Sequence, residues 1–408
     1  MLKTLKKIAF ERVAGTPQED KVFEILSGEV SSRGLEYSLE PFQIKTFQRG
    51  TGKITLLTDK PREFSANPVG LSGSADITGR MQYVEPAKID NLRDIDAPIV
   101  IVPSQMGFWD YQKLTIADKK AFIIVTSPGR KPGFHSLRQD SVERFGRIPG
   151  VVVSYEIGLK LIENEKTKIR LVTEQTEFES TSHNLVVKIP GEIEGEDILL
   201  CAHADSVAGS PGAVDNGAGC VELLGLLGHF AKHKPLRNMI FCFFGGEELG
   251  LLGSQAYVKA HSDELDKLRI IINLDLGGDI FGNNKAYITG DQEIAGYIDS
   301  RGKLKGYGLK VNRGIYSSDN MPFAREGIPA ISFGRSGLAG IMGHSPDDDV
   351  RNVDERSLRA MAGIALDFAD ELANAKAFPF ERKVPDDVKR EVDKYFMERY
   401  GIESKEDK

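Results

Sequence analysis

The second half of the chain alternates short apolar runs with amphipathic stretches. Six runs have the length and aliphatic content of buried strands: "HNLVVKIPG", "DILLCAHAD", "NMIFCFF", "RIIINLDL", "KAYIT" and "AISFG". Helical spacing is predicted between and after them, at residues 217–233, around "LLGSQAYVKAH", and at 294–304 and 355–374. Apolar strands that alternate with amphipathic helices predict an α/β fold, a three-layer α/β/α sandwich whose mixed, mostly parallel sheet is covered on both faces.

The first part of the chain follows a different pattern. Residues 8–34 have helical spacing, and "EYSLEPFQIKTF" is typical of a strand. From Leu56 to Ile169, β-rich runs such as "ADITGRMQYV", "APIVIVPSQ", "KAFIIVTS" and "GVVVSY" alternate with Pro and Gly, ending in the helical "EIGLKLIENE". We therefore predict a catalytic domain over 1–55 and 178–375, an inserted β-rich domain over 56–177 that shapes or covers the site, and a C-terminal helical extension over 376–408.

Composition narrows the class of protein. Of the 408 residues, 40% are hydrophobic and 28% charged, and no apolar run approaches the roughly 20 residues of a membrane helix. The start of the chain lacks a signal-peptide pattern, and the three cysteines are too few for a disulfide framework, so we expect a cytoplasmic protein without a membrane partner. A net charge of -7 without a basic block argues against nucleic acid and leaves small molecules or peptides as partners.

Polar residues gather where the predicted strands end. His203 and Asp205 follow the strand "DILLCA", and the pair "EE" at residues 247 and 248 follows "MIFCFFGG". Asp275 ends "RIIINLD", and His344 follows "AISFG" in the loop "GIMGHSPDDD". Ligands of α/β sheets collect at the carboxyl ends of the strands, so these side chains are expected to meet. Asp215 precedes the predicted helix at Gly217, where a carboxylate also gains from the helix dipole.

Such a set of carboxylates is typical of a metal site. Carboxylates in a cleft repel one another and resist ionisation unless cations neutralise them. One catalytic zinc takes about three protein ligands, whereas two metals about 3.5–4 Å apart need a bridging carboxylate and about two more ligands each. The candidates fit two metals and leave one glutamate for chemistry. The other histidines are assigned to packing or the surface, since "HFAKH" lacks the glutamate of H-E-x-x-H: His135, His183, His229, His233 and His261.

Six motifs, in this order and spacing, resemble the zinc exopeptidases of the aminopeptidase S and aminopeptidase Y type, kin of glutamate carboxypeptidase and the glutaminyl cyclases. They are "HAD", "GAVDNGAG", "GGEELGLLGS", "NLDLGG", "SDNMPFAREGIPA" and "GHSPDDD". The resemblance is close over residues 180–375 and loose in the N-terminal segment through "ERVAGTPQEDK". The inserted region resembles a protease-associated domain in its strand texture.

The resemblance implies a role for each candidate. His203 and Asp275 would hold one zinc, Glu248 and His344 the other, and Asp215 would bridge the two ions. Glu247 would be the general base for a hydroxide that bridges the two zinc ions and attacks the N-terminal peptide bond. Asp205 would orient His203, and Asp348 would do the same for His344. The ligand set suits Zn²⁺ but also accepts Co²⁺ or Mn²⁺.

Substrate contacts are less defined than metal ligands. Gly343 stands where relatives often place a tyrosine that stabilises the oxyanion, so Tyr316 becomes a candidate for that role, with loop packing as the alternative. Asp319 is a candidate receiver of the substrate amino group or a loop cap. Arg313 and Arg335 are candidates for a substrate carboxylate, although surface arginines are commoner.

Three function classes follow from these residues. The first is a metallo-aminopeptidase with two zinc ions. The second is a related carboxypeptidase, dipeptidase or single-zinc glutaminyl cyclase, and the third is a non-catalytic peptide-binding protein, which should have lost a ligand or the base. The sequence contains no G-x-S-x-G motif, which disfavours a serine hydrolase. The acidic "EE" after Gly246 disfavours a dinucleotide site, because a phosphate would be repelled there.

The C-terminal extension carries an apolar stripe at helical spacing. Its members are Val388, Val392, Tyr395 and Phe396. The stripe predicts a helix docked on its own domain, and the alternative is a subunit contact in a homo-oligomer.

Overall fold

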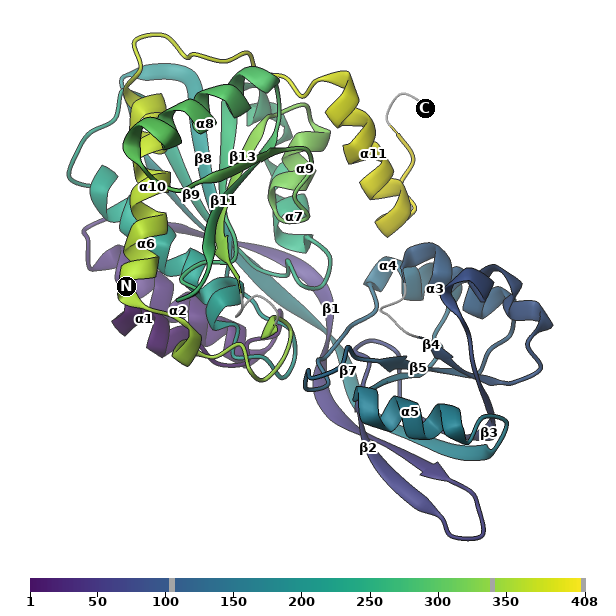
Figure 1. The fold of residues 1–408 in the computed structure, drawn as a ribbon. Helices are drawn as coiled ribbons and strands as arrows, with labels where there is room; N and C mark the ends of the chain where they lie inside the picture. The colour runs from purple at the N-terminus through teal and green to yellow at the C-terminus, as the bar shows by residue number, and fades with distance from the viewer. Residues whose placement is uncertain (103–106, 338–341, 405–408) are drawn as a thin grey trace.

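Two long strands join the two lobes of the molecule (Figure 1). The computed structural model describes residues 1–102, 107–337 and 342–404. Strand β1 (Ser38–Leu56) pairs antiparallel with β7 (Lys168–Ile189) along nearly its whole length, from Ser38 opposite Val186 to Leu56 opposite Ile169. The predicted domain boundaries therefore fall at the end of β1 and inside β7, and both lobes share one continuous ribbon.

A block of parallel strands forms the centre of the larger lobe. Strand β8 (Ile193–His203) lies between β9 (Arg237–Phe244) and β10 (Leu268–Leu274), parallel to both, and β13 (Ala330–Ser336) continues the block. Strand β7 pairs antiparallel with β9 at one side. At the other side, β11 (Asn283–Thr289) pairs antiparallel with β13 and parallel with β12 (Lys310–Arg313). The sheet is mixed with a parallel core.

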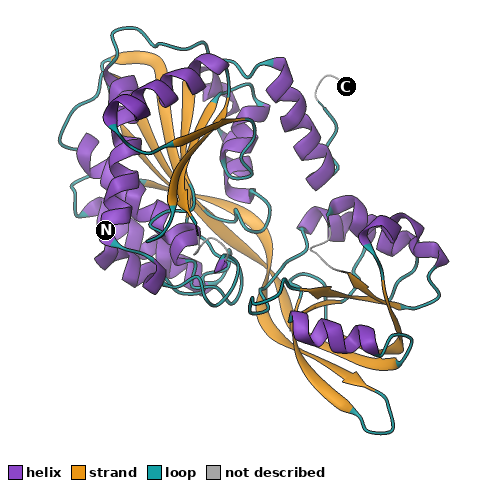
Figure 2. Ribbon diagram, in the orientation of Figure 1, coloured by secondary structure: helices purple, strands orange, loops and turns teal. Residues whose placement is uncertain are grey.

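Helices cover both faces of this sheet (Figures 1 and 2). One face carries α1 (Leu2–Ile8), α2 (Pro17–Ser31), α6 (Ala218–Phe230), α8 (Gln292–Lys305) and α10 (Glu355–Asn374). The other face carries α7 (Leu252–Ala260) and α9 (Asn320–Arg325). The predicted α/β/α sandwich is confirmed.

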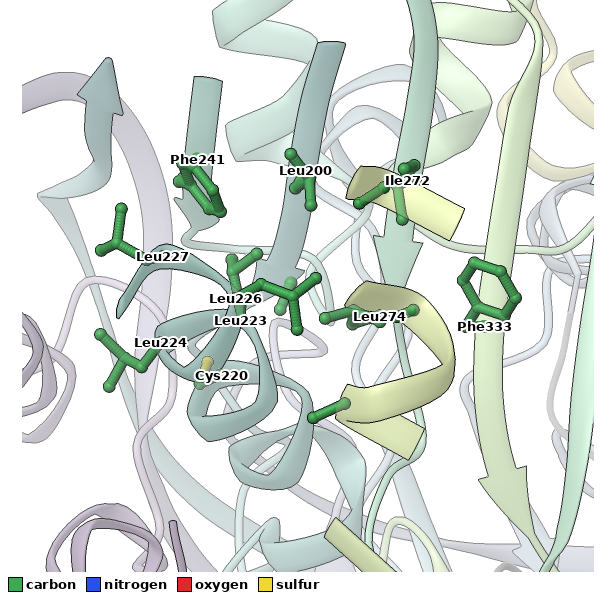
Figure 3. Packing of buried hydrophobic residues seen from close by; sticks show 14 of the residues in the cluster. Leu200, Cys220, Leu223, Leu224, Leu226, Leu227, Phe241, Ile272, Leu274 and Phe333 are labelled. Atoms are coloured by element: carbon green, nitrogen blue, oxygen red, sulfur yellow. The ribbon is translucent and has the colours of Figure 1, made fainter. Parts of the chain in front are cut away.

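Alternation along the strands explains why both faces are covered. Leu200 of β8 packs on the α6 face with Phe241 and Ile272, whereas its neighbours Leu199 and Cys201 belong to the cluster on the α7 face. Figure 3 shows the first of these clusters, in which leucines of α6 meet the strand residues. Because successive strand residues point to opposite faces, strands covered on both faces must be apolar throughout.

Local sequence fixes the helix boundaries. Asp354 and Asp291 are the N-caps of α10 and α8, and each side chain accepts a hydrogen bond from the backbone N–H two residues later. Helix α2 begins at Pro17, so the helix predicted from residue 8 onward is too long at its start. Residues 9–16 form a loop instead, and this loop carries Arg12.

The smaller lobe is more helical than the predicted β-rich insertion. Its sheet has the order β2-β6-β5-β4-β3. The strands are β2 (Arg62–Pro68), β3 (Ala75–Tyr83), β4 (Ile99–Val102), β5 (Ala121–Val125) and β6 (Gly150–Val153). The helices are α3 (Phe108–Ile116), α4 (Gln139–Phe145) and α5 (Tyr155–Glu163), with a 3-10 helix at Pro86–Asp94. The end of the predicted strand "APIVIVPSQ" lies outside the described residues.

The C-terminal helix docks on its own chain. The predicted stripe on α11 (Asp386–Tyr400) is buried in one cluster with Leu251, Met321 and Ala324. The indole N–H of Trp109 in α3 donates to the carbonyl of Met397 at 2.9 Å, so α11 also contacts the smaller lobe. Among the described residues, no helix is both long and apolar enough to cross a lipid bilayer.

Leu200→Ala is expected to lower the free energy of unfolding by about 2–5 kcal/mol, because Leu200 is 0% exposed and its removal leaves a cavity. Leu304→Ala on α8 is the matched control, because Leu304 is 77% exposed and the change should stay within about 0.5 kcal/mol. Urea denaturation followed by circular dichroism measures both. Equal urea midpoints for the two variants would contradict this packing.

Candidate metal centre

The predicted ligands converge at the carboxyl ends of the parallel strands. His203 is the last residue of β8, and Asp275 directly follows β10. Glu247 and Glu248 follow β9 after the turn at Gly246, whose φ of +67° favours glycine. His344 lies in the loop after β13, and residues 338–341 of that loop are outside the described part of the chain.

Asp215 joins two groups of ligand atoms. Its Oδ1 lies 3.2 Å from Nε2 of His203, and its Oδ2 lies 3.2 Å from Nε2 of His344. The same His203 nitrogen is 3.6 Å from Oδ1 of Asp275, and the His344 nitrogen is 3.3 Å from Oε2 of Glu248. Three groups of residues bring ligand atoms close enough to hold an ion: His203 with Asp215 and Asp275, Asp215 with Glu248 and His344, and His203 with Glu247 and Glu248. The first two groups share Asp215 and contain the ligand sets that the resemblance implies.

The spacing within each of the two groups that share Asp215 suits a shared cation better than direct hydrogen bonds. Four ligands about 2.0–2.1 Å from a tetrahedral zinc are separated from one another by about 3.3 Å. The four distances above lie around this value, whereas strong charged hydrogen bonds are about 2.7–2.9 Å long. Oδ1 of Asp275 and Oε1 of Glu248 are buried without a hydrogen-bond partner among the described residues. The residues therefore fit two metal ions that share Asp215.

The pKa shifts of the ligand side chains without metal also favour a cation site. Burial raises the pKa of Glu248 to about 8 and that of Glu247 well above its ordinary value. The charge of Glu248 raises the pKa of His344 to about 10, against the opposing effect of burial. Burial opposes the charge on Asp215 too, but hydrogen bonds to both histidines hold its pKa below its ordinary value. Protons thus occupy ligand positions that cations would otherwise take.

Two buried aspartates hold the backbone that carries the ligands. Asp205 accepts hydrogen bonds from the backbone N–H groups of Glu247 and Glu248, each at 3.1 Å. Its Oδ1 is also 3.5 Å from Nδ1 of His203, which is longer than an ordinary hydrogen bond. Orientation of His203 by Asp205 stays a prediction, and the closer contacts of Asp205 fix the glutamate turn.

Asp348 behaves in the same way toward the shared aspartate. It accepts from the backbone N–H of Val214 at 2.8 Å and from that of Asp215 at 3.1 Å. Orientation of His344 by Asp348 stays a prediction, since the hydrogen bonds of its side chain go to the segment of Asp215. Burial raises the pKa of Asp348 to about 6.

Arg12 secures the loop between His203 and Asp215. Its guanidinium is fully buried and donates to the carbonyls of Ala204 at 2.5 Å, Pro211 at 2.6 Å and Gly212 at 2.9 Å. The loop must return from the end of β8 to the start of α6, and these three bonds fix both of its ends. Sequence patterns place Arg12 in "ERVAGTPQEDK" but do not indicate this contact.

The smaller lobe contacts the loop of His344. Arg130 donates to the carbonyl of Gly343 at 2.6 Å, and Lys131 forms an ion pair with Asp347 at 2.6 Å. A Cβ at Gly133 would lie 2.4 Å from the carbonyl oxygen of His344, so the backbones approach closely there. The insertion therefore contacts the loop that carries the predicted ligand His344, and its covering of the site stays a prediction.

A cavity of about 230 Å³ opens over the centre. Its lining includes His203, Asp215, Glu247, Glu248, Asp275, His344 and Tyr316. Tyr316 also packs against Tyr287, with ring centroids 5.0 Å apart, and its role in stabilising the oxyanion stays a prediction. Asp319 is not among the described residues that line this cavity, and its Oδ1 accepts from Ser254 at 2.6 Å.

The arginines that the sequence suggested for a substrate carboxylate have other partners. Arg313 pairs with both oxygens of Asp387 on α11, at 2.6 and 2.9 Å. Arg335 donates to the carbonyl of Asp279 and to Asn284. Instead, Arg138 and Arg399 line the cavity, and both lie outside the six motifs that the sequence provides.

Comparison with known proteins agrees with this geometry. Residues 184–369 match the sequence profile of Peptidase family M28. Aminopeptidase YwaD of Bacillus subtilis (strain 168) is 26% identical over 374 residues, which cover 85% of this chain and 78% of the relative. A vacuolar membrane protease of Saccharomyces cerevisiae (strain YJM789) is 37% identical over 156 residues, 38% of this chain and 15% of that protein.

Solved structures share the fold over nearly the whole chain. The aminopeptidase from Aneurinibacillus sp. strain AM-1 has a TM-score of 0.75 at 22% identity and covers 94% of this chain and 95% of its own. BSAP, a zinc aminopeptidase from Bacillus subtilis, has a TM-score of 0.75 at 22% identity over 95% of this chain and 97% of its own. These structural likenesses show the fold, and the profile match shows that residues 184–369, which hold every predicted ligand, form a domain of Peptidase family M28.

Proposed function

We propose that this protein is a zinc aminopeptidase with two zinc ions, which hydrolyses the N-terminal peptide bond of peptides. The observation that carries the proposal is the position of Asp215, whose two oxygens each lie 3.2 Å from a different histidine. His203 and Asp275 would hold one ion, and Glu248 and His344 the other. The names of the relatives, an aminopeptidase and a zinc aminopeptidase, support the reaction and the metal.

Bound zinc supplies a Lewis acid, which polarises a peptide carbonyl and makes water more acidic. Glu247 is the residue that moves the proton. It lines the cavity beside the ligands, and it lies with His203 and Glu248 in a third group of possible ligand atoms, outside the two groups that share Asp215. As the general base, its carboxylate takes a proton from the attacking water and then delivers it to the leaving amine.

The protein also prepares Glu247 for this role. Burial raises its pKa, and so do the charges of Glu248, Asp319 and Asp275, while His203 lowers it. A base whose pKa rises from the carboxylate range toward neutrality both accepts and returns a proton efficiently. Tyr316 lines the same cavity, which supports its proposed part in stabilising the oxyanion. The amino group of the substrate would be attracted by the surrounding carboxylates.

Glu247→Gln is expected to lower kcat by about 10²–10⁴-fold, because an amide cannot accept the proton, while two zinc ions per chain remain bound. Glu248→Gln, the same change at the next residue, should lower the zinc content, because it removes a ligand. Leucine 4-nitroanilide hydrolysis and inductively coupled plasma mass spectrometry measure the two effects. Near wild-type kcat in the metal-loaded Glu247→Gln protein would refute the assignment of the base.

Metal removal should invert the dependence of stability on pH. In the metal-free protein, the pKa of Glu248 is raised to about 8, so the folded state binds more protons than the unfolded state between its ordinary pKa and 8. The raised pKa of His344 acts in the same direction above its ordinary value. The stability of the metal-free protein should therefore fall as pH rises from 6.5 to 8.

The zinc-loaded protein should show the opposite trend over this range, because protons compete with the metal for the same ligand atoms. Differential scanning calorimetry with EDTA and with added zinc, at pH 6.5 and 8, measures the two slopes. Parallel slopes in the two series would contradict the proposed ligand set.

A further inference from the structure

Two arginines from outside the M28 profile line the cavity over the metal centre. Arg138 is the N-cap residue of α4 in the smaller lobe, and Arg399 lies in the last turn of α11. The guanidinium of Arg138 lies 3.7 Å from the ring centroid of Tyr400, and that of Arg399 lies 5.3 Å from the ring centroid of Tyr395. Both rings also line the cavity. One wall of the cavity is thus cationic and aromatic.

Neither of these two arginines forms an ion pair within the part of the chain that the structure describes. Within residues 1–102, 107–337 and 342–404, Nη1 of Arg138 is also buried without a hydrogen-bond partner. Burial raises the pKa of Asp140 and the charge of Arg138 opposes this shift, but Asp140 lines an adjoining cavity that Arg138 also lines, not the one over the metal centre. By contrast, Arg313 pairs with Asp387. A buried guanidinium N–H without an acceptor is costly, so this group suits an anionic ligand.

The chemistry of that ligand follows from the place of the arginines. A guanidinium presents a planar fork of donors that matches the two oxygens of a carboxylate. The cavity is lined both by the carboxylates of the metal centre and by two guanidinium groups. This charge distribution complements a zwitterionic peptide, which carries an ammonium group at one end and a carboxylate at the other.

The cavity over the metal centre is small. Its volume of about 230 Å³ lies below the roughly 300–1,000 Å³ of pockets for drug-sized ligands. Arg138 also lines an adjoining cavity of about 630 Å³. A carboxylate that binds the arginines from within the smaller cavity, while the N-terminal peptide bond lies at the metal centre, is close to that bond in the chain.

We propose that Arg138 and Arg399 form a subsite for a substrate carboxylate, and that the preferred substrates are short peptides of two or three residues. This inference rests on the proposed function and adds the substrate class. The subsite requires both lobes, because Arg138 belongs to the insertion and Arg399 to the C-terminal helix. Trp109 and Arg144 of the insertion donate to the carbonyls of Met397 and Gly401, which fixes that helix beside Arg138.

The test compares three substrates: leucylglycine with a C-terminal carboxylate, leucylglycinamide with none, and leucylaspartic acid α-amide with a carboxylate on its second side chain. The zinc-loaded wild type should cleave leucylglycine with a kcat/KM at least about tenfold above that for leucylglycinamide, mainly through KM. Arg138→Gln should lower kcat/KM for leucylglycine by about tenfold and leave leucylglycinamide unchanged. Arg138→Lys keeps the charge but not the planar fork of donors, so its kcat/KM for leucylglycine should lie between those of the wild type and Arg138→Gln.

Two further variants control for structure. Arg399→Gln changes the other arginine without touching the stack on Tyr400, and it should reduce the same preference. Arg390→Gln alters an exposed arginine of the same helix that forms no ion pair with the described residues. It should leave kcat/KM unchanged for both leucylglycine and leucylglycinamide. Equal losses for leucylglycine and leucylglycinamide in both cavity variants would show a structural role and overturn the subsite.

The third substrate identifies the source of the carboxylate. A preference for leucylglycine over both amides, lost in Arg138→Gln, supports a C-terminal carboxylate. A preference for leucylaspartic acid α-amide over leucylglycinamide, lost in the same variant, supports an acidic side chain at the same subsite. Equal cleavage of all three by the wild type would overturn the proposal.

Binding separates this inference from the proposed function. Calorimetric titration of the Glu247→Gln protein with leucylglycine and leucylglycinamide measures the carboxylate preference without turnover. A wild type that cleaves none of the substrates, together with tighter binding of leucylglycine, would refute the peptidase and retain the subsite. Cleavage of the substrates without any difference between them in binding or kcat/KM would support the peptidase and refute the subsite.

Discussion

Repulsion between buried carboxylates is the constraint on which the catalytic lobe depends. Asp215 lies 3.2 Å from each of two histidines, while Glu248 and Asp275 bring further negative charge to the same few ångströms. Burial alone would protonate such groups, as the raised pKa of Glu248 indicates. Cations remove this conflict, since they favour the ionised form of every ligand at once. The surrounding structure then has to hold the ligands in place before the cations arrive.

Backbone hydrogen bonds to buried aspartates and to Arg12 provide this support. Asp205 fixes the turn of Glu247 and Glu248, and Asp348 fixes the segment of Asp215. Arg12 closes the loop between the first two ligands. None of these residues belongs to the two groups that share Asp215. Their charges and hydrogen bonds determine where the ligand atoms stand, as outer groups do at metal sites in general.

The sequence predicted the parts of this arrangement that follow from periodicity and strand ends. Runs such as "DILLCAHAD" specify a strand buried on both faces, and its final histidine must then lie at the carboxyl edge of the sheet. The division of ligands into two sets with Asp215 between them came from the motif resemblance, and the distances agree with it. Contacts between residues far apart in the chain, such as Arg12 with Gly212 or Asp348 with Val214, have no periodic signal.

The same limit explains why the cavity wall was not predicted. Arg313 and Arg335 attracted attention because they stand near the motifs, yet each has a partner within the fold. Arg138 and Arg399 are separated by more than half the chain, and only the docking of α11 against both lobes brings them to one cavity. A family motif can preserve the chemistry at the metal end of a cavity while segments outside that motif determine which substrates reach it. Specificity in this chain therefore depends on packing between the insertion and the C-terminal helix, which a single sequence does not encode as a local pattern.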